Sequence, residues 1–567
     1  MTIQKDTNPQ VGFRNFRSLI SHTVVSQSIS LRVLSLLEGF YISNLKNGEA
    51  SHRKTERFVD VPLLPGRAIT VGRDHHVNDI SINHPNVSRN HFVIYSIIYE
   101  LNDVQNQPHL VYVRDCKSLE GTYVGQKCIG NKEDGVAQGF YISRDVVITV
   151  KPYWRFRVSL LYNTELKYPL NSVQLKESGL FRHQYLITDR TLGRGTFANV
   201  HLALDVNTGK QLACKIHDLD RIRCLSPSDD IIRRIKNETD LLGKLNHPNM
   251  PTFIYAFRSE HTLYTFVELA TGGDLFSMRL TRGIFDEKDC KFVVRQILNA
   301  MCYLHEGGIA HRDLKPENIF FATGPGIMGR VIVGDLGFAK STLSGRMASR
   351  VGTNHYMAPE VEYGETHDLA VDIWSLGMIM VFLLAPDENA ILSTVMKINQ
   401  AAINAWLERV FEDPSQQRIT NSCQSFIRSC LMFEPVNRLR SFEAKNHSWF
   451  QQHQDTGHLK LLIKKNTEAW RPVHTISPPV QELPDMEEAS SIVYEEQGNI
   501  AYFSAPSTNL GGISPMGPIP GQNKSLKSPY FTWPRTTTSK RLKMTEGVAK
   551  QARTPRPMVN DIMASKE

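Results

Sequence analysis

The sequence predicts a multidomain protein with an all-β sandwich in residues 31–162, a two-lobed (bilobal) α+β domain in residues 185–450 and a largely disordered tail in residues 451–567. In the first region, short apolar runs are separated by Asn, Gly, Asp and Pro, a pattern typical of strands joined by turns. The second region contains a glycine-rich loop, a lysine in an apolar run and acidic motifs in a fixed order. In the third, Pro, Ser, Thr and Gly are frequent, and such composition disfavours a packed core.

The length of 567 residues leaves room for roughly two to four domains. Residues 1–30 are predicted to be a disordered amino-terminal segment, and residues 163–184 a linker between the two domains. Five apolar runs predict strands of the sandwich: Val33–Leu37, Ala68–Val71, His91–Tyr95, Leu110–Val113 and Val146–Val150.

Three polar motifs fall in or beside these strands: Val71-Gly72-Arg73, Asn86–Phe92 and Asp115–Val124. In this order they resemble the forkhead-associated (FHA) domain family. The resemblance implies a domain that binds phosphothreonine. The chemistry fits, because Arg73 offers a forked cation and Ser88 a hydroxyl donor to one phosphate. His91 is expected to support the loop rather than to touch the phosphate.

One position departs from the FHA pattern. The usual Asn-Gly-Thr is Glu120-Gly121-Thr122, so an acid replaces the asparagine that hydrogen-bonds the peptide backbone in this family. Glu120 either repels a phosphopeptide or selects basic neighbours. We still expect this domain to bind phosphothreonine. Its preference among phosphothreonine peptides stays open.

The most informative stretch of the second domain is His311-Arg312-Asp313-Leu314-Lys315-Pro316-Glu317-Asn318. It supplies a carboxylate to orient a hydroxyl nucleophile, a lysine for a transferring phosphate and an asparagine for a metal. Upstream, Leu192–Val200 fits a glycine-rich loop between two strands, with Ala198 at the third glycine position. Missing side chains in such a loop let backbone N–H groups approach phosphate oxygens.

Further motifs follow in order: Ala213–Ile216, Asn237–Leu242, Val333–Gly337, Gly352–Glu360, Asp372–Gly377 and Pro435–Arg438. Together they resemble a complete eukaryotic protein kinase domain. The sequence Lys315-Pro316-Glu317-Asn318 resembles the serine/threonine kinases, and Thr353 agrees with that choice. The second metal motif has Leu336 where the family usually has phenylalanine. Leucine has similar reach, so we expect an intact metal site.

The resemblance implies a role for each matched residue. Asp313 would orient the substrate hydroxyl, Lys315 would neutralise the γ-phosphate, and Asn318 with Asp335 would hold Mg²⁺. It also implies two ion pairs, Lys215–Glu238 and Arg438–Glu360. The residues implied for ATP binding are Leu192, Gly193, Gly195, Val200, Lys215, Glu238, Glu268, Ala270 and Asp274.

Three further features follow from the same resemblance. Val267 would be a small gatekeeper, and Asp274 lies where related kinases place an acid that contacts ribose and often a basic residue three positions before the phosphoacceptor. We therefore infer a preference for Arg-x-x-Ser/Thr substrates; the alternative for Asp274 is a solvated helix cap.

Ser349, flanked by Arg346 and Arg350, is the expected phosphorylation site of the activation segment, paired with Arg312. Because Arg346–Ser349 is itself Arg-x-x-Ser, self-association with trans-autophosphorylation is a specific hypothesis.

An FHA domain followed by such a kinase resembles the FHA-containing checkpoint kinase family, closest in layout to the fungal meiosis-specific Mek kinases. This implies recruitment to a phosphothreonine adaptor in DNA-damage or meiotic signalling, and a nuclear location. Ser539–Lys543 fits a short import signal. The net charge of +8 is modest, and the basic residues are scattered, which argues against direct nucleic-acid binding. No apolar run of about 18 residues predicts a membrane span.

Two other function classes remain as alternatives. One is a non-catalytic phosphothreonine adaptor whose kinase fold is a scaffold, and the other is a nuclear structural protein tethered through its tail. The complete set Lys215, Glu238, Asp313, Asn318 and Asp335 favours an active kinase over both.

Overall fold

The computed structural model describes residues 29–35, 58–63, 67–97, 110–133, 137–142, 145–152, 154–160, 169–195, 197–225, 230–341, 356–385, 399–412, 419–451 and 480–484, with isolated positions between residues 457 and 470. The predicted fold classes of both domains are confirmed: a β sandwich comes first and a two-lobed α+β domain follows it. In the described part of the chain, no helix combines the length and the apolar character needed to cross a membrane.

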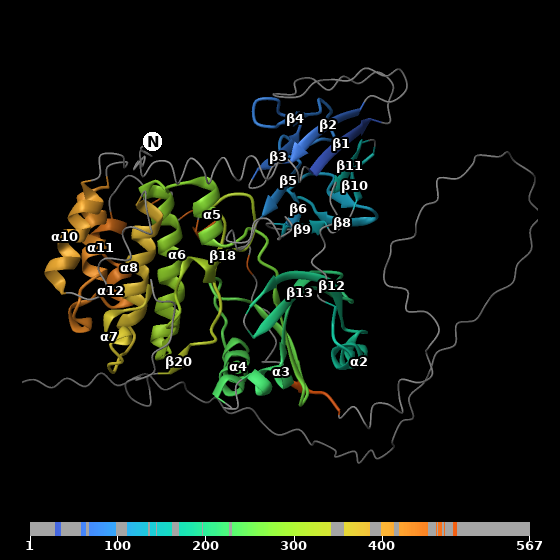
Figure 1. Cartoon of the computed structure of the whole chain (residues 1–567). Helices are drawn as coiled ribbons and strands as arrows, with labels where there is room; N and C mark the ends of the chain where they lie inside the picture. The colour runs from blue at the N-terminus through green and yellow to red at the C-terminus, as the bar shows by residue number, and fades with distance from the viewer. Residues whose placement is uncertain are drawn as a thin grey trace, which may run out of the picture. The chain divides into compact units, whose positions relative to one another are not determined.

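The amino-terminal domain consists of two packed sheets (Figure 1). One has the strand order β2-β1-β11-β10-β7-β8 and the other β4-β3-β5-β6-β9. Each of the five predicted runs overlaps a strand. The bounds are β1 (Ile29–Ser35), β2 (Phe58–Leu63), β3 (Ala68–Gly72), β4 (Ile80–Ser81), β5 (Phe92–Ile97), β6 (Leu110–Asp115), β7 (Thr122–Val124), β8 (Lys127–Gly130), β9 (Phe140–Ile142), β10 (Val146–Val150) and β11 (Trp154–Leu160).

The core of this sandwich lies between the two sheets. Phe92 on β5 and Phe156 on β11 meet edge to face with ring centroids 5.2 Å apart, and both side chains are fully buried. Strand β5 pairs antiparallel with both β3 and β6, so the end of β3, the start of β5 and the end of β6 lie at the same end of the sandwich. As a result, the loops that follow β3, precede β5 and follow β6 can hold polar side chains near one another.

The smaller lobe of the second domain is a mixed sheet with helices against it (Figure 1). The strand order is β12-β13-β14-β16-β15-β21. Its strands are β12 (Tyr185–Arg194), β13 (Ala198–Asp205), β14 (Gln211–Asp218), β15 (Phe253–Arg258), β16 (Thr262–Glu268) and β21 (Gln481–Glu482), and its helices are α2 (Ser172–Phe181), α3 (Leu219–Leu225) and α4 (Asp230–Leu242).

Two of these elements differ from the expectation drawn from the sequence. Helix α2 lies within the predicted linker, but Asn171 and Gln174 form a capping box at its start, and Phe181 stacks on Phe257 at 4.2 Å. Burying this ring on the sheet holds the helix against the lobe. Strand β21 comes from the predicted tail, where composition gives no sign of a strand.

The larger lobe is mostly helical, with α6 and α8 at its centre. Every residue of α8 from Val371 to Leu384 is buried, so this helix is surrounded by protein on all sides. The helices are α5 (Leu275–Arg282), α6 (Glu287–Glu306), α7 (Pro359–Glu362), α8 (Ala370–Leu384), α10 (Gln400–Phe411), α11 (Asn421–Cys430) and α12 (Ser441–Lys445). The short strands are β17 (Ile309–Ala310), β18 (Ile319–Phe321), β19 (Val331–Val333) and β20 (Lys340–Ser341).

Candidate active site and phosphate-binding loops

A partly buried ion pair joins the sheet of the smaller lobe to helix α4. The Nζ atom of Lys215 on β14 lies 2.8 Å from Oε1 of Glu238, and 3.7 Å from Oδ1 of Asp335. Burial disfavours the charged lysine, but the two carboxylates outweigh it, so the pKa of Lys215 is raised. Lys215 is therefore a permanent cation, held where the two lobes meet.

The glycine-rich loop connects β12 to β13, with Gly193 opposite Val200 in the register and the backbone N–H of Gly195 donating to the carbonyl of Ala198. A Cβ atom added at Gly193 would meet no atom within 4 Å, and one at Gly195 would meet only Ala198 O, at 3.6 Å. Packing within the described protein therefore does not require glycine here. The space suits a ligand that approaches the backbone closely, such as a nucleotide phosphate.

The catalytic-loop residues form one hydrogen-bonded cluster. Lys315 Nζ donates to Asp313 Oδ2 at 2.8 Å, and the Asn318 amide donates to the same oxygen at 3.0 Å and to the Asp313 carbonyl at 2.8 Å. Asp313 and Asn318 are buried. Because the Asn318 nitrogen is turned toward Asp313, its amide oxygen accepts no hydrogen bond from the described residues. That oxygen can ligate a metal.

The second acidic motif makes a sharp turn after β19. Asp335 has a left-handed backbone with φ 58°, an unusual conformation for a residue with a side chain. Burial would raise its pKa, but Lys215, His311 and Lys315 outweigh it and hold the pKa below its usual value. Asp335 is thus a carboxylate at neutral pH. Together with Asn318 it offers the hard oxygen ligands that Mg²⁺ prefers, so these residues fit a divalent metal. Leu336, in place of the usual phenylalanine, is buried.

Asp372 on α8 fixes the backbone of the catalytic loop. Its two oxygens accept the N–H groups of His311 and Arg312, each at 2.8 Å, and it also contacts His305 Nε2 at 2.9 Å. Arg312 has a φ of 66°. A non-glycine residue adopts this conformation only when its surroundings over-determine it. The motif Asp372–Gly377 could be recognised in the sequence, but not that the Asp372 carboxylate holds both backbone donors.

Glu268 at the end of β16 uses its side chain within the protein. It forms an ion pair with Arg330 and accepts hydrogen bonds from Thr252 N at 2.9 Å and Thr252 Oγ1 at 2.7 Å. Its backbone begins the segment that joins the two lobes, which also contains Ala270. The sequence gives no sign of this partly buried pair of Glu268 and Arg330, since nothing local pairs these positions.

Asp274 caps helix α5. Its side chain accepts hydrogen bonds from Ser277 N at 2.7 Å and Ser277 Oγ at 2.9 Å. The helix-cap alternative is therefore present, but the residue is buried rather than solvated. Burial raises the pKa of Asp274 to about 6. A carboxylate held in this way can still attract a cation through its remaining acceptor positions.

The ion pair implied between Glu360 and Arg438 is present and fully enclosed. Both guanidinium nitrogens contact the carboxylate, at 2.6 Å and 2.7 Å, and the Arg438 side chain is 0% exposed. The guanidinium also lies over the Trp374 ring, 5.0 Å from its centroid. This pair ties the start of α7 to the segment before α12.

The predicted phosphorylation site Ser349 lies outside the described residues, as do Arg346, Arg350 and Thr353. Arg312, its expected partner, is half-buried, and its Nε donates to the carbonyl of Phe338 at 2.7 Å. Burial lowers the pKa of Arg312 to about 10, and the nearby positive charge of Arg234 acts in the same direction. Two arginines on different elements thus lie close enough to repel each other.

The FHA-like loops lie together at the end of the sandwich. The backbone N–H of Arg73 donates to the Ser88 carbonyl at 2.8 Å, and Ser88 Oγ accepts from Leu119 N at 2.9 Å. His91 is buried, with Nδ1 3.2 Å from Ser88 N and Nε2 3.2 Å from Gly121 O. It supports the loops from beneath, as expected from the sequence. Arg73 and Glu120 are both exposed, and the Arg73 side chain makes no ion pair with a described residue.

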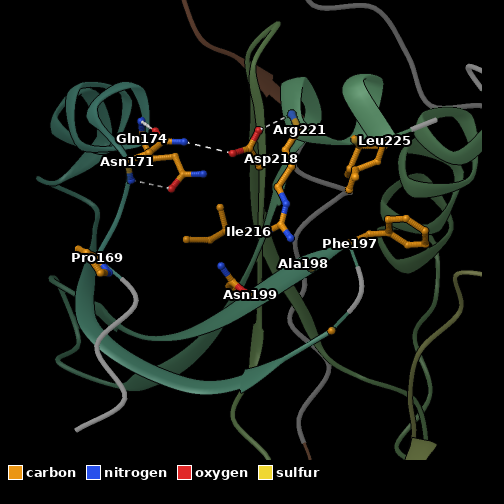
Figure 2. A pocket seen from close by; sticks show the side chains of 12 residues that line it. Pro169, Asn171, Gln174, Phe197, Ala198, Asn199, Ile216, Asp218, Arg221 and Leu225 are labelled. Carbon is orange, nitrogen blue, oxygen red and sulfur yellow. Dashed lines mark hydrogen bonds between the residues drawn. The ribbon is translucent and has the colours of Figure 1, made fainter. Parts of the chain in front are cut away.

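A separate cavity of about 140 Å³ lies on the smaller lobe, between α2, α3 and the glycine-rich loop (Figure 2). Figure 2 shows the Arg221 side chain reaching into it, opposite Asn171 of the α2 cap. Asn171 donates to Asp218 at 3.2 Å, and both residues line the cavity. Of the residues implied for ATP binding, only Gly195 lines it, so this cavity is distinct from the space around Lys215 and Asp313.

Comparison with known proteins agrees with this geometry. A model described as "Protein kinase domain" matches residues 186–450, and one described as "FHA domain" matches residues 69–142. The serine/threonine-protein kinase cds1 of Schizosaccharomyces pombe is 30% identical over 390 residues, covering 66% of this chain and 79% of cds1. The chain belongs to the FHA-containing serine/threonine protein kinases.

Two further relatives show how far the similarity of this FHA kinase extends. The meiosis-specific serine/threonine-protein kinase mek1 of S. pombe is 29% identical over 457 residues, which cover 76% of this chain and 95% of mek1. The calcium/calmodulin-dependent protein kinase type 1 of Macrobrachium nipponense is 33% identical over 272 residues, 47% of this chain and 74% of that protein. The kinase therefore uses ATP and a divalent metal, and its FHA domain binds phosphothreonine partners.

Proposed function

We propose that this kinase transfers the γ-phosphate of ATP, with Mg²⁺, to Ser or Thr in Arg-x-x-Ser/Thr sequences, and that its FHA domain recruits it to phosphothreonine adaptors in nuclear DNA-damage checkpoint or meiotic recombination signalling. The observation that carries this proposal is the cluster of Asp313, Lys315 and Asn318, together with Asp335 beside the Lys215–Glu238 pair. The same set argues against a non-catalytic adaptor with a scaffold kinase fold.

The chain's own residues act by positioning and by charge. Asp313 accepts a hydrogen bond from the substrate hydroxyl and orients its oxygen for in-line attack, while Lys315, already 2.8 Å away, offsets negative charge on the transferring group. Asn318 and Asp335 would hold the metal, which would supply positive charge to offset that of the phosphates. Lys215 would contact the α- and β-phosphates, and Glu238 keeps it in place. Leu192 and Val200 would pack on adenine, and the backbone near Glu268 and Ala270 would hydrogen-bond it.

Asp274 is proposed to bind the substrate arginine, and its pKa of about 6 makes this testable by pH. In the unfolded chain the Asp274 carboxyl loses its proton from about pH 4 upward. In the folded protein it keeps this proton up to about pH 6, so the charged carboxylate predominates only above that pH. We expect purified protein to prefer an Arg-x-x-Thr peptide over Ala-x-x-Thr at pH 7.5, and to lose part of that preference at pH 5.5. The ratio of kcat/KM values for the two peptides measures it.

The matched variant is Asp274→Asn, which retains an oxygen for the α5 cap but carries no charge. Any lost contact with the ribose of ATP should lower the rates on both peptides equally, and the remaining preference for arginine should be small and independent of pH. An unchanged, pH-dependent arginine preference in Asp274→Asn would assign the specificity to another residue. Equal rates on both peptides in the wild type would remove the Arg-x-x-Ser/Thr proposal.

The FHA proposal depends on Arg73 and Ser88. Because an arginine–phosphate contact at the centre of an interface is a hot spot, Arg73→Ala should weaken binding of a phosphothreonine peptide by roughly thirtyfold or more. Titration of peptides from a phosphothreonine library, measured by fluorescence anisotropy, tests this. Arg157→Ala on β11, also an exposed arginine, is the control. If Arg73→Ala binds as tightly as the control, the phosphate is held elsewhere.

Ser349 is proposed to be phosphorylated by a second copy of the kinase. A phosphate there would bring roughly −1.5 to −2 charges to the like-charged pair Arg312 and Arg234. We expect Ser349→Ala to stay at its basal rate after incubation with ATP, while Ser344→Ala in the same segment is activated normally. Mass spectrometry should detect phosphate at Ser349 of a catalytically inactive copy mixed with active kinase. Normal activation of Ser349→Ala would contradict the proposal.

A further inference from the structure

A short segment beyond the kinase domain returns to the smaller lobe and extends its sheet. Strand β21 pairs in parallel with β15, with Gln481 opposite Phe257 and Glu482 opposite Arg258. The backbone N–H of Leu483 donates to the Arg258 carbonyl at 2.7 Å. In Figure 1 the segment is the short orange-red stretch beside α3. Without it, β15 would present an open edge of backbone donors and acceptors.

Side chains on both strands strengthen this pairing. Arg258 Nε donates to both carboxylate oxygens of Glu482, at 2.9 Å and 3.2 Å, and the Tyr255 hydroxyl donates to Gln481 Oε1 at 2.9 Å. The hydrogen bond with Glu482 raises the pKa of Arg258. A two-pronged contact of this kind selects one register, because a shift of one residue would separate the charges.

The two apolar residues of the segment reach different parts of the lobe. Leu483 packs against the cluster on the outer face of the sheet, which contains Phe257 and Phe181. Val480 packs against a smaller cluster formed by Leu219 and Ile222 of α3, Ile232 and Ile235 of α4, and Leu263 of β16. This smaller cluster holds α4 against the sheet.

Helix α4 carries Glu238 on the same face as this cluster. Its buried residues are Ile232, Ile235, Glu238, Thr239 and Leu242, at the spacing of one helix face. Any rotation of the helix that releases Ile235 therefore also moves Glu238 away from Lys215. Val480 packs against this cluster, and the cluster shares the buried face of α4 with Glu238.

We propose that the edge of β15 and the groove beside α4 are a docking surface for residues Val480–Pro484 of the same chain, and that Val480 and Glu482 are positioning residues for the Lys215–Glu238 pair. Phosphate transfer then depends on a segment outside the kinase domain. Because the segment is tethered to the same chain, its effective concentration at the groove is high without strong contacts, so docking can also be released.

The test uses the full chain with Val480→Ala and Leu483→Ala combined. We expect kcat/KM for ATP to fall roughly ten- to a hundredfold, since small displacements of a positioning group have effects of this size. KM for ATP should rise while KM for the peptide substrate stays constant, because Lys215 would contact the nucleotide only. Hydrogen exchange should rise in α4 and β15. Val480→Ile should retain activity. The control is Val436→Ala, which truncates a valine that is 83% exposed.

A charge exchange provides an independent arm. Arg258→Glu and Glu482→Arg should each reduce activity, and the double variant should recover it, since the pair is restored with reversed sign. Glu434→Arg is the control for a new surface arginine. The proposal is overturned if the Val480/Leu483 variant retains wild-type kinetics and exchange. It is also overturned if only the amount of active enzyme falls while both KM values stay unchanged, because that pattern indicates a purely structural role. The wild-type rate on the peptide tests the substrate proposal by itself. If the wild type is active, a loss of activity in the variants reports on the segment alone.

Discussion

Asp313→Ala should lower the rate of phosphate transfer to an Arg-x-x-Thr peptide by about a thousandfold, the central value for the loss of a positioned acid–base group. The expected loss is large because Asp313 is the acceptor at the centre of the cluster, hydrogen-bonded to both Lys315 and Asn318. Removing it withdraws the group that orients the hydroxyl and also frees the two side chains that it aligns. Steady-state kinetics with ATP and Mg²⁺ measure the effect.

Two further variants interpret this result. Asp313→Asn keeps an oxygen acceptor for Lys315 and Asn318, so it should keep the fold and the affinity for ATP while remaining nearly inactive. Glu434→Gln removes an exposed carboxylate whose side chain caps nothing, and it should be fully active. Substantial activity in both Asp313 variants would move the assignment toward a phosphothreonine adaptor, with the measured phosphate transfer coming from a contaminating kinase.

Arg438→Ala should destabilise the kinase domain by about 3–5 kcal/mol, because it leaves the buried Glu360 carboxylate without its partner. Both side chains are enclosed, with exposed fractions of 0% for Arg438 and 4% for Glu360. For a domain of this size the loss corresponds to a fall in Tm of roughly 10 °C. Differential scanning calorimetry, with loss of kinase activity to identify the transition, measures it.

The chain provides a matched control. Arg428 and Glu408 form an ion pair of similar length, 2.7 Å, but their side chains are 28% and 56% exposed. Exposed pairs contribute about 0–1 kcal/mol, so Arg428→Ala should shift Tm little. Combining Arg438→Met with Glu360→Gln removes both charges and should recover part of the loss. If Arg438→Ala and Arg428→Ala behaved alike, burial would not be what makes the first pair important.

The parts of the site that could be predicted from sequence are those with a local signature. Asp313, Lys315 and Asn318 lie within one stretch, where chain geometry alone brings them together. The glycine-rich loop could be predicted from its glycines. The Lys215–Glu238 pair joins distant positions, yet it could be predicted because each partner belongs to a recognisable motif whose place in the fold is known. The described structure has this pair and the Arg438–Glu360 pair.

Other features had no such signature. Helix α2 reads as a linker because it is short, and its stability comes from Phe181 stacking on Phe257, a residue far along the chain. The cap made by Asp274 was only one of two alternatives in the sequence, and its burial, which raises its pKa, depends on the surrounding lobe. The pairing of β21 with β15 involves two tail residues, Gln481 and Glu482, and the composition around them resembles the rest of the tail.

The two fold classes, the order of the domains and the groups expected to bind phosphate could be predicted from the sequence, because spacing along the chain encodes strands, loops and catalytic motifs. The three-dimensional fold was needed to show which groups share a hydrogen bond, which carboxylates are buried and which distant segment completes the sheet. Burial from water and nearby charges determine these properties, and both come from residues that are distant in sequence. A local sequence pattern therefore cannot predict them.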